Sequence, residues 1–216
     1  MSPGKPSLSA GSFVARDERE QLFVALAELV VEQGYERTAP EQVTARAELP
    51  HDAFDRYFDS KRECLLAAFE AGAEQALTAS ADAYMSSPGS WAEAVHAALA
   101  GLLDFLAGSP AMTRMCTVEA LNAGSPALER RDRVLERFAD FLEPGYAQRP
   151  DPPPTVVSEA ISGGVFELIR AHAVERRIES LPQSLPEATV IALSPFVGSE
   201  QAERLAARPA RVRMGD

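Results

Sequence analysis

Between residues 17 and 66 the sequence repeatedly signals the start or the end of a helix. The signals lie so close together that this stretch can form only separate helices of unequal length. Glycine adopts the left-handed conformation at a helix end without a Cβ penalty, so Gly34 is predicted to end the first helix. That helix, predicted over 17–33, is marked by apolar residues with the i, i+3, i+4, i+7, i+8 spacing of one helical face: Leu22, Ala25, Leu26, Leu29 and Val30.

Two short helices are predicted next. The segment Thr38-Ala-Pro-Glu41 has the S/T-x-x-E form of a capping box, which indicates a helix over about 39–47. Pro50 lies in the break that follows, and a second short helix is predicted from His51 to Tyr57. Another capping box, Ser60-Lys-Arg-Glu63, then starts a long helix.

The rest of the chain also shows helical spacing, and no long alternation of Val, Ile, Thr and aromatic residues predicts a strand. The proline-rich segment 148–154 is predicted to be a surface loop. The further helices are predicted over 91–106, 111–121, 126–142, 155–177 and 186–198. The sequence therefore predicts an all-α fold.

Charge and composition exclude several classes of protein. The chain has 21 Lys+Arg and 32 Asp+Glu, a net charge of −11, which argues against a generally basic nucleic-acid binder or a polybasic membrane-surface protein. The chain has 2 cysteines, too few for a disulfide framework, and they favour a reducing compartment. No apolar run reaches the roughly 18 residues of a membrane span, and residues 1–12 lack the apolar core of a secretion signal. We therefore expect a cytoplasmic protein.

A helix, a short helix, a tight turn and a second short helix make up a helix-turn-helix, whose last helix fits the major groove of DNA, about 12 Å wide. Residues typical of one family recur along this stretch: Arg19, Leu22, Gly34, Tyr35, Thr38, Val43, Ala47, Phe54, Tyr57, Phe58, Ser60, Lys61 and Leu65. Over residues 19–66 the chain thus resembles the N-terminal domain of TetR-family transcriptional regulators.

The resemblance implies a three-helix DNA-binding domain followed by a helical ligand-binding and dimerisation domain. It implies a repressor that binds a palindromic double-stranded DNA operator as a homodimer and is released by a small apolar or amphipathic effector. We accordingly expect a flexible arm at 1–15, the helix-turn-helix domain at 16–62, the ligand-binding and dimerisation domain at 63–200 and a C-terminal tail at 201–216.

The resemblance also implies which residues face DNA. Thr38, Tyr57 and Lys61 hold positions where the family contacts phosphates. In addition, Arg56 is a candidate reader of guanine, and Asp52 could accept a hydrogen bond from cytosine N4. The predicted DNA-binding residues are Thr38, Arg46, His51, Asp52, Arg56, Tyr57 and Lys61.

This stretch departs from the family in ways that leave an alternative open. Glu48, Pro50, Ala53 and Asp55 stand where the family usually has Gly, Ser, Thr and Tyr, and Asp55 replaces a phosphate-contacting tyrosine with a negative charge. Residues 36–62 carry five Lys+Arg and six Asp+Glu, a net of −1, so counterion release contributes little. The alternative is a helical dimeric ligand-binding or protein-interaction module whose degenerate helix-turn-helix binds DNA weakly or not at all.

The middle helices are rich in Met and aromatic residues, which suit a ligand pocket because they adapt in shape and bury large areas. The same residues also suit a plain core. The residues predicted to line a pocket are Tyr84, Trp91, His96, Leu102, Phe105, Met112, Met115, Cys116, Glu119, Phe138 and Phe141.

The last two predicted helices resemble the family's dimer surface, a four-helix bundle with two helices from each subunit. A two-fold dimer presents its recognition helices about one DNA turn apart, which implies a palindromic operator. The residues predicted at the dimer interface are Ile161, Val165, Leu168, Ile169, His172, Val190, Leu193, Phe196 and Val197.

An enzyme is the third class of function. The sequence has no GxSxG, HExxH, CxxC or P-loop motif, and the three histidines fall on separate predicted helices. A hydrolase built on Cys116 and His96 is the enzymatic alternative that the sequence leaves open. We expect no catalytic residues, no metal and no cofactor.

Overall fold

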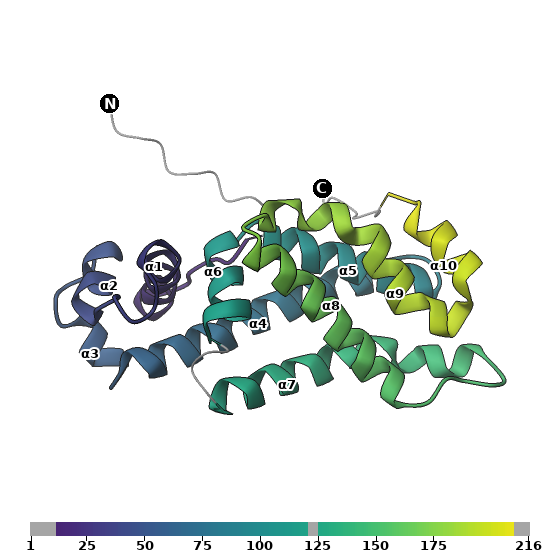
Figure 1. The fold of residues 1–216 in the computed structure, drawn as a ribbon, viewed down its shortest axis with the longest axis horizontal. Coiled ribbons are helices and arrows are strands. Elements are labelled where there is room, and N and C mark those ends of the chain that lie inside the picture. Colours follow the sequence, from purple (N-terminus) through teal and green to yellow (C-terminus); the bar gives the residue numbers. More distant parts are fainter. Residues whose placement is uncertain (1–11, 121–124, 210–216) are drawn as a thin grey trace.

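The computed structural model describes residues 12–120 and 125–209, and every regular element within these residues is a helix. The predicted all-α fold is confirmed. A small group of N-terminal helices lies at one end of an elongated molecule, and a larger helical body makes up the rest (Figure 1).

The N-terminal group is held together by apolar side chains from all of its helices. The ring of Phe58 lies at the centre, with its centroid 5.7 Å from that of Phe23 and 5.6 Å from that of Phe54. Leu65 is also fully buried, so the first turns of the fourth helix belong to this core. The helices are α1 (Glu18–Gln33), α2 (Pro40–Arg46), α3 (Ala53–Tyr57) and the start of α4 (Lys61–Ser86).

Local sequence signals set the ends of these helices. At the start of α1 the carboxylate of Asp17 accepts a hydrogen bond from the Glu20 backbone N–H at 2.9 Å. The helix ends as predicted at Gly34, whose φ of +88° is rarely adopted by residues with a side chain. The capping box of α2 is one residue later than predicted: Ala39 is the N-cap, and its N–H donates to Gln42 Oε1 at 2.8 Å.

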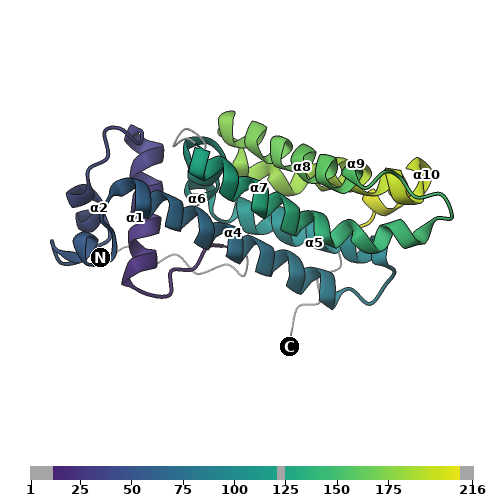
Figure 2. The same cartoon turned by 90° about the horizontal axis from the view of Figure 1, so that it is seen from below.

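The larger body is built around α4, which runs from the N-terminal group into it, and α5, which packs along α4. The helix α10 lies at the end opposite to α1, α2 and α3 in both views (Figure 1, Figure 2). The remaining elements are α5 (Trp91–Ala107), α6 (Pro110–Arg114), η1 (Met115–Glu119), α7 (Ser125–Ala139), η3 (Asp140–Gln148), α8 (Val156–Val174), η4 (Ile178–Ser184), α9 (Leu185–Val197) and α10 (Ser199–Ala206).

Three of these elements differ from the predicted helices. The helix predicted over 111–121 is α6 followed by the π-helical turn η1. The helix predicted over 126–142 ends at Ala139 and tightens into the 3-10 helix η3, which contains Pro144. Part of the expected C-terminal tail is the helix α10, which buries Leu205.

The described part of the expected N-terminal arm is docked on the body. The backbone N–H of Phe13 donates to Ser109 Oγ at the start of α6. The backbone of Val14 makes two hydrogen bonds of 3.0 Å with the side-chain amide of Gln75 on α4. The docked segment therefore joins the beginning of α1 to α4 and α6; residues 1–11 of the expected arm lie outside the described residues.

No single helix in the described part of the chain is long and apolar enough to cross a membrane. One pair, Trp91–Ala107 with Pro110–Glu119, reaches the required length and hydropathy only together, and it is bent by 101°. Many of its side chains are buried, Leu103 and Met115 completely.

Candidate functional site

The exposed face of α3 and the turn before it is the candidate DNA-binding face. Ala53 and Phe54 are buried against the domain core, as is Phe58 at the C-cap. These three residues fix the helix, and its other side chains point outward. The exposed residues are His51, Asp52, Asp55, Arg56 and Tyr57.

The turn between α2 and α3 contains a backbone conformation unusual for its residue type. Glu48 has a φ of +57°, in the left-handed region where glycine is preferred. The turn is therefore formed by a residue that is strained in this conformation.

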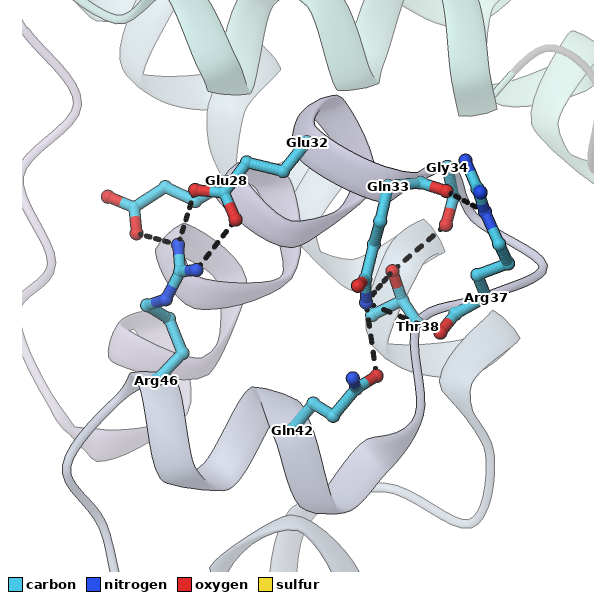
Figure 3. Close-up of polar contacts among 8 residues, drawn as sticks. All are labelled: Glu28, Glu32, Gln33, Gly34, Arg37, Thr38, Gln42 and Arg46. Carbon is cyan, nitrogen blue, oxygen red and sulfur yellow. Dashed lines mark hydrogen bonds and ion pairs between the residues drawn. The ribbon is translucent and has the colours of Figure 1, made fainter.

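Arg46, predicted to face DNA, is held by two carboxylates of α1 (Figure 3). Its guanidinium makes a bidentate contact with Glu32, at 2.9 and 2.7 Å, and lies 3.1 Å from Glu28 Oε2. Hydrogen bonding to Arg46 lowers the pKa of Glu32. A phosphate would therefore have to compete with two acids for this side chain.

Thr38 is buried, not exposed as the predicted phosphate contact requires. Its side chain is 2% exposed, and its hydroxyl donates to the Gly34 carbonyl at 3.0 Å (Figure 3). The hydroxyl also accepts a hydrogen bond of 3.4 Å from Gln33 Nε2. The one-residue shift of the α2 cap explains this correction, because Thr38 ends the connecting turn and does not begin the helix.

Lys61, predicted to bind a phosphate, secures the same turn. Its Nζ donates to the carbonyl oxygens of Tyr35, at 2.6 Å, and Thr38, at 2.8 Å. The ammonium group also lies 4.2 Å from the centroid of the Tyr35 ring, within range of a cation–π interaction. This side chain therefore ties the start of α4 to the connection between α1 and α2.

Tyr57 and Arg56 share an acidic partner on α1. The hydroxyl of Tyr57 donates to Glu18 Oε2 at 3.1 Å, and Arg56 lies 3.5 Å from the same oxygen. Arg56 also lies 3.8 Å from Asp52 Oδ2. Both side chains are substantially exposed, so these contacts are weak surface interactions that a ligand can displace.

A cavity of about 130 Å³ lies inside the helical body. It is lined by residues of α4, α5, α6, η1, α7, η3, α8 and α9, and its lining is mainly carbon. Six of the predicted pocket residues line it: Leu102, Phe105, Met112, Cys116, Phe138 and Phe141. Burial raises the pKa of the Cys116 thiol to about 12, so the thiol is neutral at physiological pH.

The other five predicted pocket residues do not line this cavity. The indole of Trp91 donates to the Phe141 carbonyl at 3.0 Å, and Tyr84 packs on Phe141 with ring centroids 5.3 Å apart. Met115 is fully buried core. Glu119 lies 3.8 Å from Arg114 and borders a separate polar hollow beside the turn after α1.

His96 is the remaining predicted pocket residue, and it joins α5 to α9. Its Nδ1 lies 2.8 Å from Thr189 Oγ1, and its Nε2 is buried with no hydrogen-bond partner in the described part of the chain. Burial lowers the pKa of the imidazole. These contacts make His96 a structural link between the two helices.

The cavity residues of α4 and α8 are not among those predicted from the sequence. Small residues of α4 open the space, and residues of α8 that were predicted at a dimer interface close it. These residues have helical spacing in the sequence, but that spacing does not show whether an apolar helix face lines an internal cavity or a dimer interface. The missed residues include Phe69, Gly72, Ala73, Ala76, Ser80, Ile161, Ser162, Val165 and Ile169.

Most of the predicted dimer residues are buried within a single chain. This corrects the prediction, because a side chain that already packs in its own core cannot form the contact surface for a second copy. The buried residues are Ile161, Val165, Ile169, His172, Leu193 and Phe196, while Leu168, Val190 and Val197 are half-buried. The outward face of these helices carries other residues: Val156, Ala160, Gly164, Val174 and Ile191.

Known proteins are similar to this chain in its N-terminal helices, which carry the candidate DNA-binding face. Residues 22–68 match the family described as "Bacterial regulatory proteins, tetR family". The nucleoid occlusion factor SlmA of Haemophilus ducreyi is 34% identical over 128 residues, which cover 58% of this chain and 61% of that protein. The chain thus matches about three fifths of the length of this curated relative.

Solved structures share the fold over most of the chain at low sequence identity. The fatty acid degradation regulator FadR of Bacillus halodurans has a TM-score of 0.72 at 12% identity, covering 86% of this chain and 97% of its own. The transcriptional regulator FadR of Bacillus subtilis, solved in complex with stearoyl-CoA, has a TM-score of 0.69 at 14% identity, covering 82% of this chain and 97% of its own.

Proposed function

Because this chain is a TetR-family regulator by its N-terminal domain and its fold, we propose that it binds a palindromic DNA operator as a homodimer and is released by a small, largely apolar effector. The observation that carries the proposal is the exposed face of α3. Buried Phe54 and Phe58 hold this short helix rigidly at the end of the molecule, where it is free to enter a major groove.

The proposed DNA contacts come from groups that have weak partners of their own. Arg56 and Tyr57 give up a shared contact with Glu18, and Arg46 gives up two carboxylates of α1 when it meets a phosphate. Each exchange replaces an existing ion pair or hydrogen bond with a new contact, so the net gain in binding free energy is small. We expect modest affinity, because few cations are available to neutralise phosphates.

The cavity is the proposed effector site, and α4 is the proposed connection to the DNA-binding face. Phe69 and Gly72 of α4 line the cavity, while Lys61 at the start of the same helix holds the turn after α1. A ligand that favours one position of α4 therefore changes the position of the helix-turn-helix. Release from DNA follows only if the ligand binds the released state better.

The proposed dimer uses the outward face of α8 and α9. This face combines small and apolar residues with the Glu167–Arg170 ion pair: Gly164 and Ala160 allow a close approach, and Ile191 is 41% exposed. We expect Ile191→Glu to convert a dimer into a monomer in sedimentation velocity. Met85→Glu, at a 72% exposed site at the end of α4, is the matched control and should leave the dimer intact.

DNA binding is tested by fluorescence anisotropy with fragments from upstream of the protein's own coding region. We expect one fragment to bind specifically, and Arg56→Ala to weaken that binding at least fivefold, in line with the roughly 1–3 kcal/mol of a base-contacting arginine. Arg204→Ala removes an equally charged, exposed side chain on α10 and should change binding less than twofold.

A second candidate is favoured by the internal pairing of the cations on the DNA-facing side. With Arg46, Arg56 and Lys61 all engaged, the domain could serve as a protein-interaction module that binds DNA weakly or not at all. Failure of every upstream fragment to bind at 50 mM salt, with the dimer intact, would favour this candidate.

A further inference from the structure

One hydroxyl in the cavity has no hydrogen-bond partner among the residues that the structure describes. The cavity lining contains four hydroxyl groups, and three of them donate to backbone carbonyls: Ser80 to Ala76 at 3.0 Å, Thr113 to Leu106 at 2.9 Å and Thr117 to Thr113 at 2.7 Å. Ser162 on α8 is 7% exposed, lines the same cavity and makes no hydrogen bond to any described residue. Because the Ser162 oxygen is not among the completely enclosed polar atoms without a partner, a ligand or water can reach it and pair with it.

The cavity offers no partner for a charged ligand. None of the described residues that line it is Asp, Glu, Lys, Arg or His, and its thiol, on Cys116, is neutral. Moving an ionised group into such surroundings without a counter-charge is strongly unfavourable. The lining therefore selects a neutral molecule.

The volume of the cavity limits the size of that molecule. At about 130 Å³ it is slightly smaller than the engineered cavity of about 150 Å³ that binds benzene in another protein. Phe69, Phe105 and Phe138 line it with flat aromatic surfaces. A compact molecule with a single ring matches this space.

We propose that the cavity binds a neutral, single-ring molecule carrying one hydroxyl group, a phenol-class ligand, and that Ser162 determines this specificity by pairing with the ligand hydroxyl. The proposal rests on the proposed function of the cavity as the effector site and names the chemical class of its ligand. Van der Waals contact with the carbon lining supplies affinity, and Ser162 distinguishes a hydroxyl from a methyl group.

The test compares phenol, toluene and benzoate by isothermal titration calorimetry on the full chain without DNA. Phenol and toluene have nearly the same size and differ in one polar group, while benzoate adds a charge. Ser162→Ala is the test variant. Ser80→Ala is the matched control, because it removes the same atom from the same cavity but from a hydroxyl already bonded to its own helix.

We expect Ser162→Ala to weaken phenol binding about threefold to tenfold, the effect of one neutral hydrogen bond, and to change toluene binding less than twofold. Ser80→Ala should shift phenol and toluene alike, and benzoate should bind far more weakly than phenol. The proposal is overturned if neither phenol nor toluene binds, if benzoate binds as well as phenol, or if both serine variants affect phenol equally.

A second measurement separates this proposal from the proposed function. Phenol is added to the complex of the protein with its upstream fragment, and anisotropy reports release. If phenol releases the protein from DNA and Ser162→Ala weakens that release, the result supports both the ligand class and the role of the cavity as the effector site. If phenol binds through Ser162 and the DNA complex persists, the ligand class stands and the regulatory role of the cavity is overturned.

Discussion

At the scale of single residues, the DNA-facing domain satisfies its polar side chains internally. Arg46 bonds to Glu28 and Glu32, Lys61 bonds to backbone carbonyls, and the Thr38 hydroxyl is buried. Positions along the sequence identified these residues, but their partners come from α1 and from the turn after it. The acidic groups of α1, which lie outside the segment with the net charge of −1, therefore add to the carboxylates around its cations.

Releasing Arg46 should strengthen DNA binding. In the double variant Glu28→Gln with Glu32→Gln the guanidinium loses both carboxylates, and we expect about threefold to tenfold tighter binding at 50 mM salt with a steeper salt dependence. The control is Glu70→Gln with Glu74→Gln, which removes the same charge from the partners of Arg130 and Arg137 on the helical body. Equal gains from both variants would attribute the effect to net charge alone.

The strained turn residue yields a stability prediction. Glu48→Gly removes the cost of a left-handed conformation at φ +57°, and we expect the free energy of unfolding to rise by about 0.5–1 kcal/mol in urea denaturation. Glu48→Gln keeps the strain while removing the charge, so it should leave stability nearly unchanged. A gain from Gln as large as that from Gly would contradict the backbone explanation.

At the scale of elements, most helices follow the sequence signals, and the exceptions lie where tertiary packing intervenes. The segment from Met115 to Glu119 forms a π-helical turn, and Asp140–Gln148 tightens into a 3-10 helix. In η3 the backbone of Gly145 approaches Trp91 and Phe196, whose rings meet edge to face at 5.4 Å. Neither feature leaves a periodic signal in the sequence.

This close approach makes Gly145 a sensitive position. A Cβ built there would lie 2.4 Å from Trp91 and 2.9 Å from Phe196, so Gly145→Ala should lower the free energy of unfolding by about 1–3 kcal/mol. Trp91 is the chain's one tryptophan, and its emission should shift in the same variant. Gly163→Ala on α8, where a Cβ meets nothing within 4 Å, is the control and should not destabilise the chain; equal losses in both variants would refute the steric argument.

At the scale of the whole molecule, α5 and α9 are joined through the buried His96 and Thr189. Burial lowers the pKa of His96, an effect that the charge of Arg208 reinforces and the backbone of Arg208 opposes. As pH falls through about 6.5, the ordinary pKa of histidine, His96 becomes protonated in the unfolded chain while it remains neutral in the folded chain. Stability contributed by neutral His96 is therefore present above this pH and lost below it.

We expect His96→Gln to remove this part of the pH dependence. Urea unfolding at pH 7.5 and pH 5.5 gives the difference in stability, to which one group contributes at most about 1.4 kcal/mol per pH unit. His51→Gln, at an exposed site beside α3, should keep the wild-type difference. The same difference in wild type and in His96→Gln would exclude His96 as the source.

The sequence by itself determined the all-α fold, the helix-turn-helix and the ends of most helices. Helical spacing, caps and glycine stops act between residues a few positions apart, so they are readable along the chain. Six residues of the cavity could also be named from the apolar and aromatic side chains of the middle helices, although Tyr84, Trp91 and Met115, chosen on the same grounds, lie elsewhere.

Only the tertiary structure decided what each predicted face covers. Ile161 and Val165 were expected at a dimer interface, yet they close the cavity from α8. The acidic partners of Arg46 and the carbonyl partners of Lys61 lie 14 to 26 residues away along the chain. Periodicity shows that a helix has an apolar face, but which helix packs against it, and which charges meet, depends on how the whole chain is arranged in space.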